Sequence, residues 1–173
     1  KLRQNVEDSP GVRRDYHGHM AMCTGIDEVF GQIVDKLKEK GLEDDTIVIF
    51  TSDHGDLLSS CGKPWAKAFA EDGSCRVPML IRYPGRLPAG TTSDPLFGSL
   101  DIMPTLLSLL GIKPPATCQG MDLSQAILKR RDDAVEAQPL YMIAVGNGWR
   151  GIYTHEHTYA YDKETQQKIK FDC

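Results

Sequence analysis

An aspartate and a histidine, Asp53 and His54, lie side by side directly after the apolar run of residues 47–50. This run is β-branched and aromatic, which is typical of a strand that is buried on both faces of a parallel sheet. Ligands in open α/β sheets bind where strands pass into loops, and Gly55 permits a sharp turn there. The carboxylate and the imidazole could therefore share a divalent cation, with a solvated loop as the alternative.

A long loop, residues 56–75, follows this pair and contains Lys63 and Lys67. Loops of this length with little secondary structure are usually functional or disordered. A fixed ammonium group beside a cation would stabilise negative charge that develops on a substrate. A solvated surface charge is the competing interpretation of either lysine. Cys61 and Cys75 flank the loop and could form a disulfide, with free or buried thiols as the alternative.

The elements that would position this loop alternate between helix and strand. Residues 1–14 carry a Pro-Gly pair and are expected to be an irregular lead-in. Apolar residues then recur every three or four positions over residues 15–40, which predicts an amphipathic helix that covers a sheet and buries Cys23. A second apolar run, residues 77–83, predicts another strand. This order indicates an α/β fold with helices flanking a mostly parallel sheet.

The second half of the chain predicts shorter elements. Residues 100–112 should form a helix, with Asp101 as its N-cap and Pro104 in its first turn. A further short helix is expected over residues 121–129. Three strands should follow at residues 140–145, 149–154 and 158–161, the first two joined by a hairpin turn at Asn147-Gly148.

Composition limits the classes of protein that remain. The chain has 173 residues, of which 40% are hydrophobic and 25% charged, as in an ordinary globular domain. Its net charge of -4 and the lack of a basic stripe argue against a nucleic-acid partner. No apolar run approaches the roughly 20 residues of a transmembrane helix. The five cysteines form no CxxC pair, so they predict neither a zinc ribbon nor a redox compartment.

Several motifs closely resemble the sulfatase family. The match is continuous from about His19 to Asp56 and includes Gly-Leu-x-Asp-Asp-Thr and Ser-Asp-His-Gly. Later matches are Arg-Val-Pro at residues 76–78, the helix that begins near Asp101, and Trp-Arg-x-Ile-x-Thr at residues 149–154. The resemblance implies part of an alkaline-phosphatase-like sandwich. Residues 1–135 would belong to the later part of the catalytic α/β domain and residues 136–173 to a small C-terminal antiparallel sheet.

The resemblance also implies roles for the candidate residues. Asp53 and His54 match positions that bind a divalent metal, usually calcium; because imidazole tolerates softer ions, magnesium, manganese or zinc are alternatives. Lys67 matches the lysine that contacts the sulfate group, and Lys63 does so if the loop is aligned differently. Glu71 replaces the family's aromatic residue, a departure that concerns the substrate pocket more than the metal pair. The expected partner is a small-molecule or carbohydrate sulfate ester.

The family's nucleophile is a formylglycine made from the Cys or Ser of a Cys/Ser-x-Pro-x-Arg motif, which these 173 residues do not contain. We therefore expect the chain to be inactive alone and to act with the remaining part of a sulfatase chain. A related phosphodiesterase or phosphonate monoester hydrolase and a non-catalytic sulfatase-like remnant are the alternatives. The family occurs in periplasmic, secreted and lysosomal settings, and no compartment is assigned.

Overall fold

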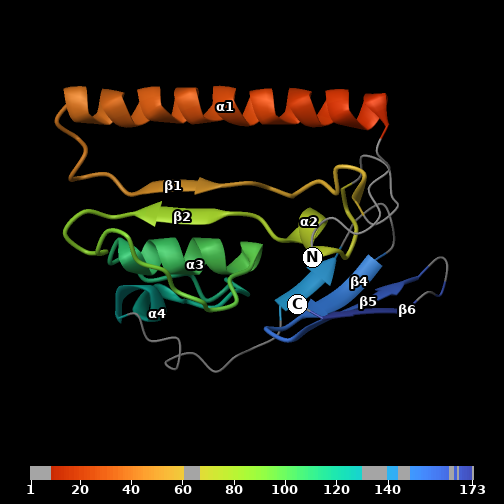
Figure 1. The fold of residues 1–173 in the computed structure, drawn as a ribbon. Helices are drawn as coiled ribbons and strands as arrows, with labels where there is room; N and C mark the ends of the chain where they lie inside the picture. The colour runs from red at the N-terminus through yellow and green to blue at the C-terminus, as the bar shows by residue number, and fades with distance from the viewer. Residues whose placement is uncertain are drawn as a thin grey trace. The chain divides into compact units, whose positions relative to one another are not determined.

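The computed structural model describes residues 9–60, 67–129, 140–143, 149–163, 166 and 168–172. By internal contacts the chain divides into two compact units, residues 1–85 and 86–173, each of which contains helices and strands (Figure 1). The α/β class is therefore confirmed. The division at residues 135 and 136 that the family resemblance implies stays a prediction.

The first unit begins with the long helix α1 (Pro10–Glu39), which starts five residues earlier than the hydrophobic pattern indicated. Ser9 is its N-cap, and the Ser9 hydroxyl accepts a hydrogen bond from the Val12 N–H at 3.3 Å. Pro10 occupies the first helical position, where a missing N–H costs nothing and a fixed φ favours the helix. The expectation of an irregular lead-in is thus wrong for residues 10–14, because Pro-Gly here opens a helix.

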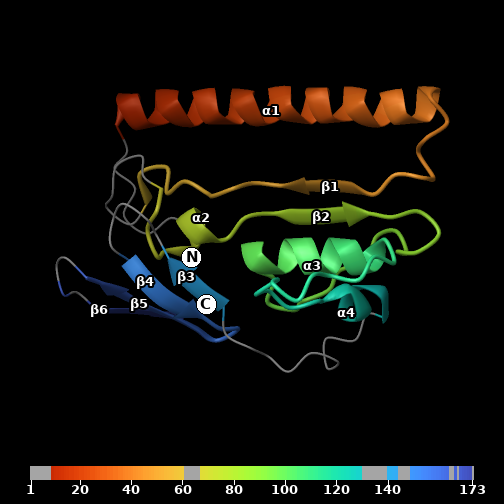
Figure 2. The same ribbon diagram turned by 180° about the vertical axis from the view of Figure 1, so that it is seen from behind.

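The strands of the first unit are β1 (Val48–Thr51) and β2 (Met79–Arg82), and they pair antiparallel (Figure 2). In this pairing Ile49 lies opposite Ile81. The expectation of parallel pairing is wrong for these two strands. Parallel neighbours need a crossover of a dozen or more residues, usually a helix. In the described part of the connection the helix is α2 (Asp72–Cys75), which is a single turn. All strand pairs in the described ranges are antiparallel.

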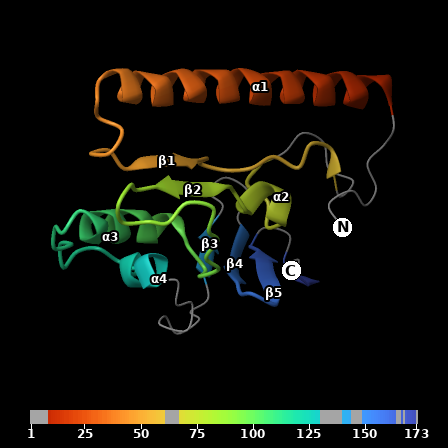
Figure 3. The same cartoon turned by 60° about the vertical axis from the view of Figure 1, so that its left-hand side comes forward.

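Helix α1 runs alongside β1 (Figure 3). The two are joined by an edge-to-face contact of Phe30 and Phe50, whose ring centroids are 5.3 Å apart. None of the side chains of α1 is fully buried. Cys23 is an exposed free thiol, so the expectation that it is buried is wrong. A second apolar row on α1 is also more than half exposed and comprises Met22, Ile26, Val29 and Ile33.

In the second unit, helix α3 (Ser99–Leu109) is followed by helix α4 (Ser124–Lys129). Asp101 is not the N-cap that we predicted, because Gly98 takes that position. Asp101 lies at the third position of the helix, only 5% exposed, and its carboxylate accepts the N–H groups of Gly98 at 2.8 Å and Met121 at 2.7 Å. One carboxylate therefore caps α3 and fastens it to the segment that precedes α4.

The C-terminal sheet has the order β3-β4-β5-β6 and is antiparallel throughout, which confirms the predicted small antiparallel sheet. The predicted hairpin turn at Asn147-Gly148 lies outside the described residues. The fourth strand was not predicted separately. The strands are β3 (Leu140–Ile143), β4 (Trp149–Tyr153), β5 (His157–Asp162) and β6 (Lys168–Asp172).

Along β5 the side chains alternate between the two faces of the sheet. Thr158, Ala160 and Asp162 are at most 7% exposed, whereas Tyr159 is 47% exposed. This period of two indicates one covered and one solvated face. Within the described part of the chain, no helix is both long and apolar enough to cross a membrane.

Replacing Asp101 with alanine should lower the free energy of unfolding by about 2–4 kcal/mol, because two backbone N–H groups lose a charged acceptor. Urea unfolding of the chain, followed by circular dichroism, measures the change. Asp27→Ala, on the exposed side of α1, is the matched control and should stay within about 0.5 kcal/mol of the parent. Equal losses in both variants would contradict the assigned role of Asp101.

Candidate active site

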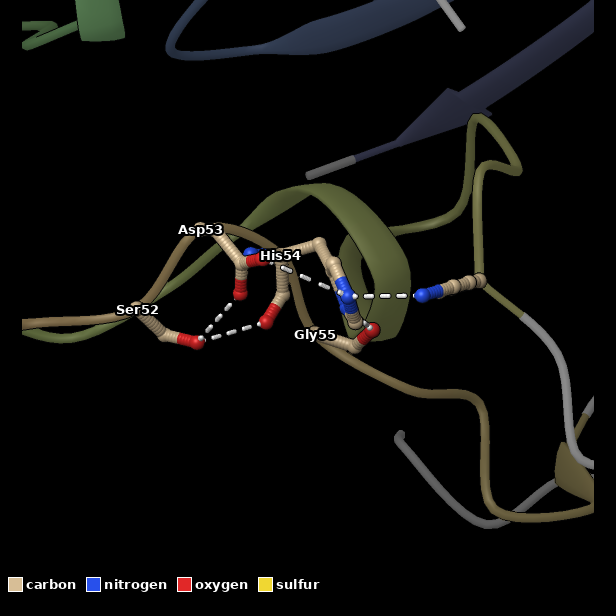
Figure 4. Close-up of polar contacts among 5 residues, drawn as sticks. Ser52, Asp53, His54 and Gly55 are labelled. Carbon is tan, nitrogen blue, oxygen red and sulfur yellow. Dashed lines mark hydrogen bonds and ion pairs between the residues drawn. The ribbon is translucent and has the colours of Figure 1, made fainter. Parts of the chain in front are cut away.

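The polar residues that follow β1 form a compact turn (Figure 4). The Ser52 hydroxyl donates a hydrogen bond to the His54 carbonyl oxygen at 2.8 Å. The His54 N–H in turn donates to Asp53 Oδ1 at 3.0 Å. These short-range bonds fix the direction in which the two side chains leave the backbone, so Asp53 and His54 lie together at the end of the strand as the sequence predicted.

Gly55 holds this turn against helix α2. Its N–H donates to the Ser74 carbonyl oxygen at 2.9 Å, and an added Cβ would lie 2.1 Å from the carbonyl oxygen of Gly73. Gly55 is not among the glycines with positive φ. Glycine is therefore required here by the close approach of two backbone segments, whereas the sequence had suggested a sharp turn.

The His54 ring is oriented by its backbone. Nδ1 lies 2.8 Å from the Gly55 carbonyl oxygen, which can only accept a hydrogen bond, so Nδ1 carries the proton. Nε2 lies 3.2 Å from Nζ of Lys67, which can only donate. In this tautomer the Nε2 lone pair points toward Nζ of Lys67. That is the arrangement in which a histidine binds a metal through Nε2 while its other nitrogen is fixed by a carbonyl.

Asp53 supplies negative charge beside this ring. Its Oδ2 lies 3.6 Å from His54 Nε2, and its side chain is 85% exposed. Charge on His54 lowers the pKa of Asp53 below 3.8, and the backbone and Ser52 hydrogen bonds act in the same direction, against an opposing effect of burial. Nε2 cannot accept from Lys67 and donate to Asp53 at once. The Lys67 contact is the shorter one, so Nε2 acts as the acceptor in this structure; when His54 is protonated, its charge acts on Asp53 instead.

The loop that carries Lys67 is fastened through Ser74, a residue for which no role was predicted. Ser74 is 3% exposed, and its hydroxyl accepts the Phe69 N–H at 3.1 Å. Its carbonyl oxygen accepts the Gly55 N–H, so one residue links both sides of the site. The sequence contained only a weak signal for this contact. Two consecutive small residues, Gly73 and Ser74, leave room for the Gly55 backbone.

The remaining predictions for this loop have different outcomes. Lys63 lies outside the described residues. Cys75 is a free thiol, so the disulfide with Cys61 that the sequence left open is not formed. Burial, followed by the nearby charges of Asp72 and Glu71, raises the pKa of Cys75 to about 11. The Cys75 thiol donates to the Phe69 carbonyl oxygen at 2.8 Å, which gives it a structural role.

Asp53 and His54 offer one anionic oxygen ligand and one nitrogen ligand, a pair that suits a divalent cation. Within the described ranges, no third aspartate, glutamate, histidine or cysteine joins them in a group that could hold a metal. The two residues therefore fit part of a metal centre, and further ligands would have to come from outside this group.

Comparison with solved structures defines the class. A sulfatase structure from Bacteroides fragilis superposes with a TM-score of 0.85 at 31% identity, covering 98% of this chain and 39% of that one. A phosphonate monoester hydrolase of Agrobacterium radiobacter gives a TM-score of 0.67 at 26% identity, over 82% of this chain and 31% of that one. The fold is that of the alkaline-phosphatase-like superfamily.

Sequence comparison then gives the family. The sulfatase family model matches residues 3–112, and the model for the C-terminal region of N-sulphoglucosamine sulphohydrolase matches residues 63–169. An ulvan-active sulfatase of Formosa agariphila is 36% identical over 86% of the chain, and an endo-4-O-sulfatase of Bacteroides thetaiotaomicron 33% over 82%. The chain belongs to the sulfatase family. It spans 30% and 28% of the length of these two relatives.

Replacing Gly55 with alanine should destabilise the chain by about 1–3 kcal/mol, because the new Cβ overlaps the Gly73 carbonyl oxygen. Thermal or urea unfolding measures this loss. Gly31→Ala is the matched control, since a Cβ at Gly31 would meet nothing within 4 Å beyond its own helix backbone, and alanine favours helices. It should stabilise α1 by about 0.5–1 kcal/mol. An unchanged stability of the Gly55 variant would refute the close approach.

The carboxyl group of Asp53 should titrate below 3.8, and His54→Ala should raise its pKa toward that value, because the imidazole is the largest cause of the shift. Since the folded-state pKa is lowered, the contribution of Asp53 to stability is present above the unfolded pKa and is lost as pH falls through the lowered one. Carbon-detected NMR titration measures both values. His17→Ala, on α1, should leave the Asp53 titration unchanged.

Proposed function

We propose that this chain supplies part of the active site of a sulfatase that hydrolyses a sulfate monoester on a carbohydrate. The observation that carries the proposal is the arrangement at the end of β1, where the outward lone pair of His54, the carboxylate of Asp53 and the ammonium of Lys67 meet in a member of the sulfatase family. A cation site beside a fixed positive charge is suited to binding an anionic ester.

Asp53 and His54 would hold the divalent metal, with calcium as the first choice and magnesium, manganese or zinc as alternatives. When bound, the metal would draw charge from an oxygen of the sulfate group. The chain's own contribution is to orient its ligands. The Gly55 carbonyl oxygen fixes the proton of His54 on Nδ1, and Ser52 and the His54 N–H restrain the backbone turn that directs Asp53.

Lys67 would bind the sulfate group. Its Nζ now donates to His54 Nε2 at 3.2 Å, the same lone pair that a metal would use. Metal binding would therefore release the ammonium from this contact and leave it beside the metal, directed to an anionic oxygen. Lys63 is the alternative sulfate ligand that the sequence raised.

The nucleophile would come from the remaining part of the sulfatase chain, since the formylglycine motif is not among these 173 residues. The chain alone should therefore not turn over substrate. Its described residues would bind and orient the metal and the sulfate group. The covalent chemistry would be carried out by a residue outside this sequence.

A carbohydrate substrate is supported by the relatives. One is named for activity on ulvan, another as an endo-4-O-sulfatase, and a structure with a TM-score of 0.77 was solved with its substrate D-glucosamine-2-N,6-O-disulfate. Because a phosphonate monoester hydrolase has a similar structure, hydrolysis of a phosphonate or phosphodiester is the second candidate activity. The replacement of an aromatic residue by Glu71 is the feature that favours a non-catalytic relative.

In the longest natural form of the protein, Asp53→Asn and His54→Ala should each weaken metal binding at least about tenfold, because each removes one ligand. Lys67→Ala should retain the metal and lose turnover of a sulfated disaccharide. Isothermal titration with calcium and manganese, and release of inorganic sulfate, measure the two effects. Asp27→Asn and His17→Ala, both on α1, are matched controls that should behave as the parent does.

Three outcomes would contradict this proposal. Unchanged metal affinity in both ligand variants would remove the metal assignment. Faster hydrolysis of a phosphonate monoester than of any sulfate ester tested would replace the sulfatase by the second candidate. If the longest natural form binds metal but hydrolyses neither ester, the non-catalytic alternative is correct.

A further inference from the structure

The exposed face of the C-terminal sheet carries an ordered set of aromatic and basic side chains. Cross-strand partners in an antiparallel sheet point to the same face, so the register defines two rows across β4, β5 and β6. We refer to these two rows as the Tyr-Lys face. One row is Arg150, Tyr161 and Lys168, and the other is Ile152, Tyr159 and Lys170.

The register and burial both place this set on the solvated side. On β5, Ala160 lies between Tyr159 and Tyr161 in sequence and points to the covered side of the sheet, where it is 6% exposed. Tyr159 and Ile152, on the opposite face, are 47% and 37% exposed. Arg150, Lys168 and Lys170 are exposed as well. The face thus offers three cations and two tyrosines on one surface, in a chain whose net charge is -4.

The contacts within the face hold its aromatic rings. Lys170 Nζ lies 5.6 Å from the ring centroid of Tyr159, and the ring of His157 meets Tyr159 edge to face at 5.8 Å. The Tyr161 hydroxyl donates a hydrogen bond to Gln166. Tyr159 is thus held between Lys170 and His157, and tyrosine offers a large rigid surface with a polar tip.

We propose that the Tyr-Lys face binds a sulfated polysaccharide chain through residues other than those of the candidate active site. Aromatic rings contact the apolar C–H surface of sugars, and the three cations match regularly spaced sulfate groups. By strand geometry the face is about 10 Å wide across three strands and about 7 Å long, so both rows can contact one extended polymer. The inference rests on the proposed function, which makes a sulfated carbohydrate the substrate.

Such a surface would keep the enzyme on its polymer between catalytic events. A second contact to the same chain raises the effective concentration of substrate without any change in the active site. Because the attraction is largely electrostatic and exposed, it should weaken as salt is added. Hydrolysis of a small sulfate ester, which does not need this second contact, should not depend on it.

Binding to dextran sulfate, with unsulfated dextran as the reference polymer, tests the proposal by biolayer interferometry at about 0.15 M salt. The double variant Lys168→Glu and Lys170→Glu should lose at least about tenfold in affinity, because two attractive charges become repulsive. The charge-matched control Lys38→Glu and Lys40→Glu, at the end of α1, should lose less than about twofold. Tyr159→Ala should lose a few-fold and leave the net charge unchanged.

Equal losses in the two double variants would show a general effect of net charge and overturn the proposal. Absence of dextran sulfate binding in the longest natural form would do the same, whether the face is covered by another segment or does not recognise the polymer. Asp53→Asn should leave polymer binding intact. If metal affinity is unchanged in the Asp53 and His54 variants but the polymer still binds to the Tyr-Lys face, the proposed function alone is refuted. If the metal assignment holds but the polymer does not bind, the proposal for the Tyr-Lys face alone is refuted.

Discussion

The candidate active site depends on a contact between two backbone segments at which Gly55 has no room for a side chain. Gly55 donates its N–H to Ser74, and its α-carbon lies so close to Gly73 that a Cβ would come within 2.1 Å of a carbonyl oxygen. This contact joins the end of β1 to helix α2. The loop that carries Lys67 is thereby fixed relative to His54, although the two are 13 positions apart in sequence.

The same glycine links packing to chemistry. Its N–H is used to hold α2, and its carbonyl oxygen holds Nδ1 of His54, so the position of the ring follows from the position of the backbone. The Nε2 lone pair is then available to a cation, and Lys67 contacts it in this structure. The ammonium group of Lys67 thus places a positive charge beside this exposed pair, which no third aspartate, glutamate, histidine or cysteine of the described residues joins.

Local patterns predicted most of this arrangement, and contacts distant in sequence account for the differences. The strand end, the Asp53-His54 pair and the C-terminal sheet could be predicted because each is encoded within a short run of residues. The antiparallel pairing of β1 and β2 could not, because it depends on how the long connection returns. Asp101 was correctly identified as structural, but its partner Met121 is 20 positions away and the pattern holds no trace of it.

Helix α1 shows the same limit in its burial. Apolar spacing predicted the helix correctly, but it merged two neighbouring stripes into one covered face. Phe30 contacts Phe50 of β1, whereas Ile26 and Ile33, on an adjacent stripe, are 54% and 52% exposed. A stripe of that kind is stable as a helix but gains nothing from burial in the described part of the chain. The periodicity of apolar residues indicates which side chains lie on one face and can be buried together. Which of them are buried depends on the element that packs against that face.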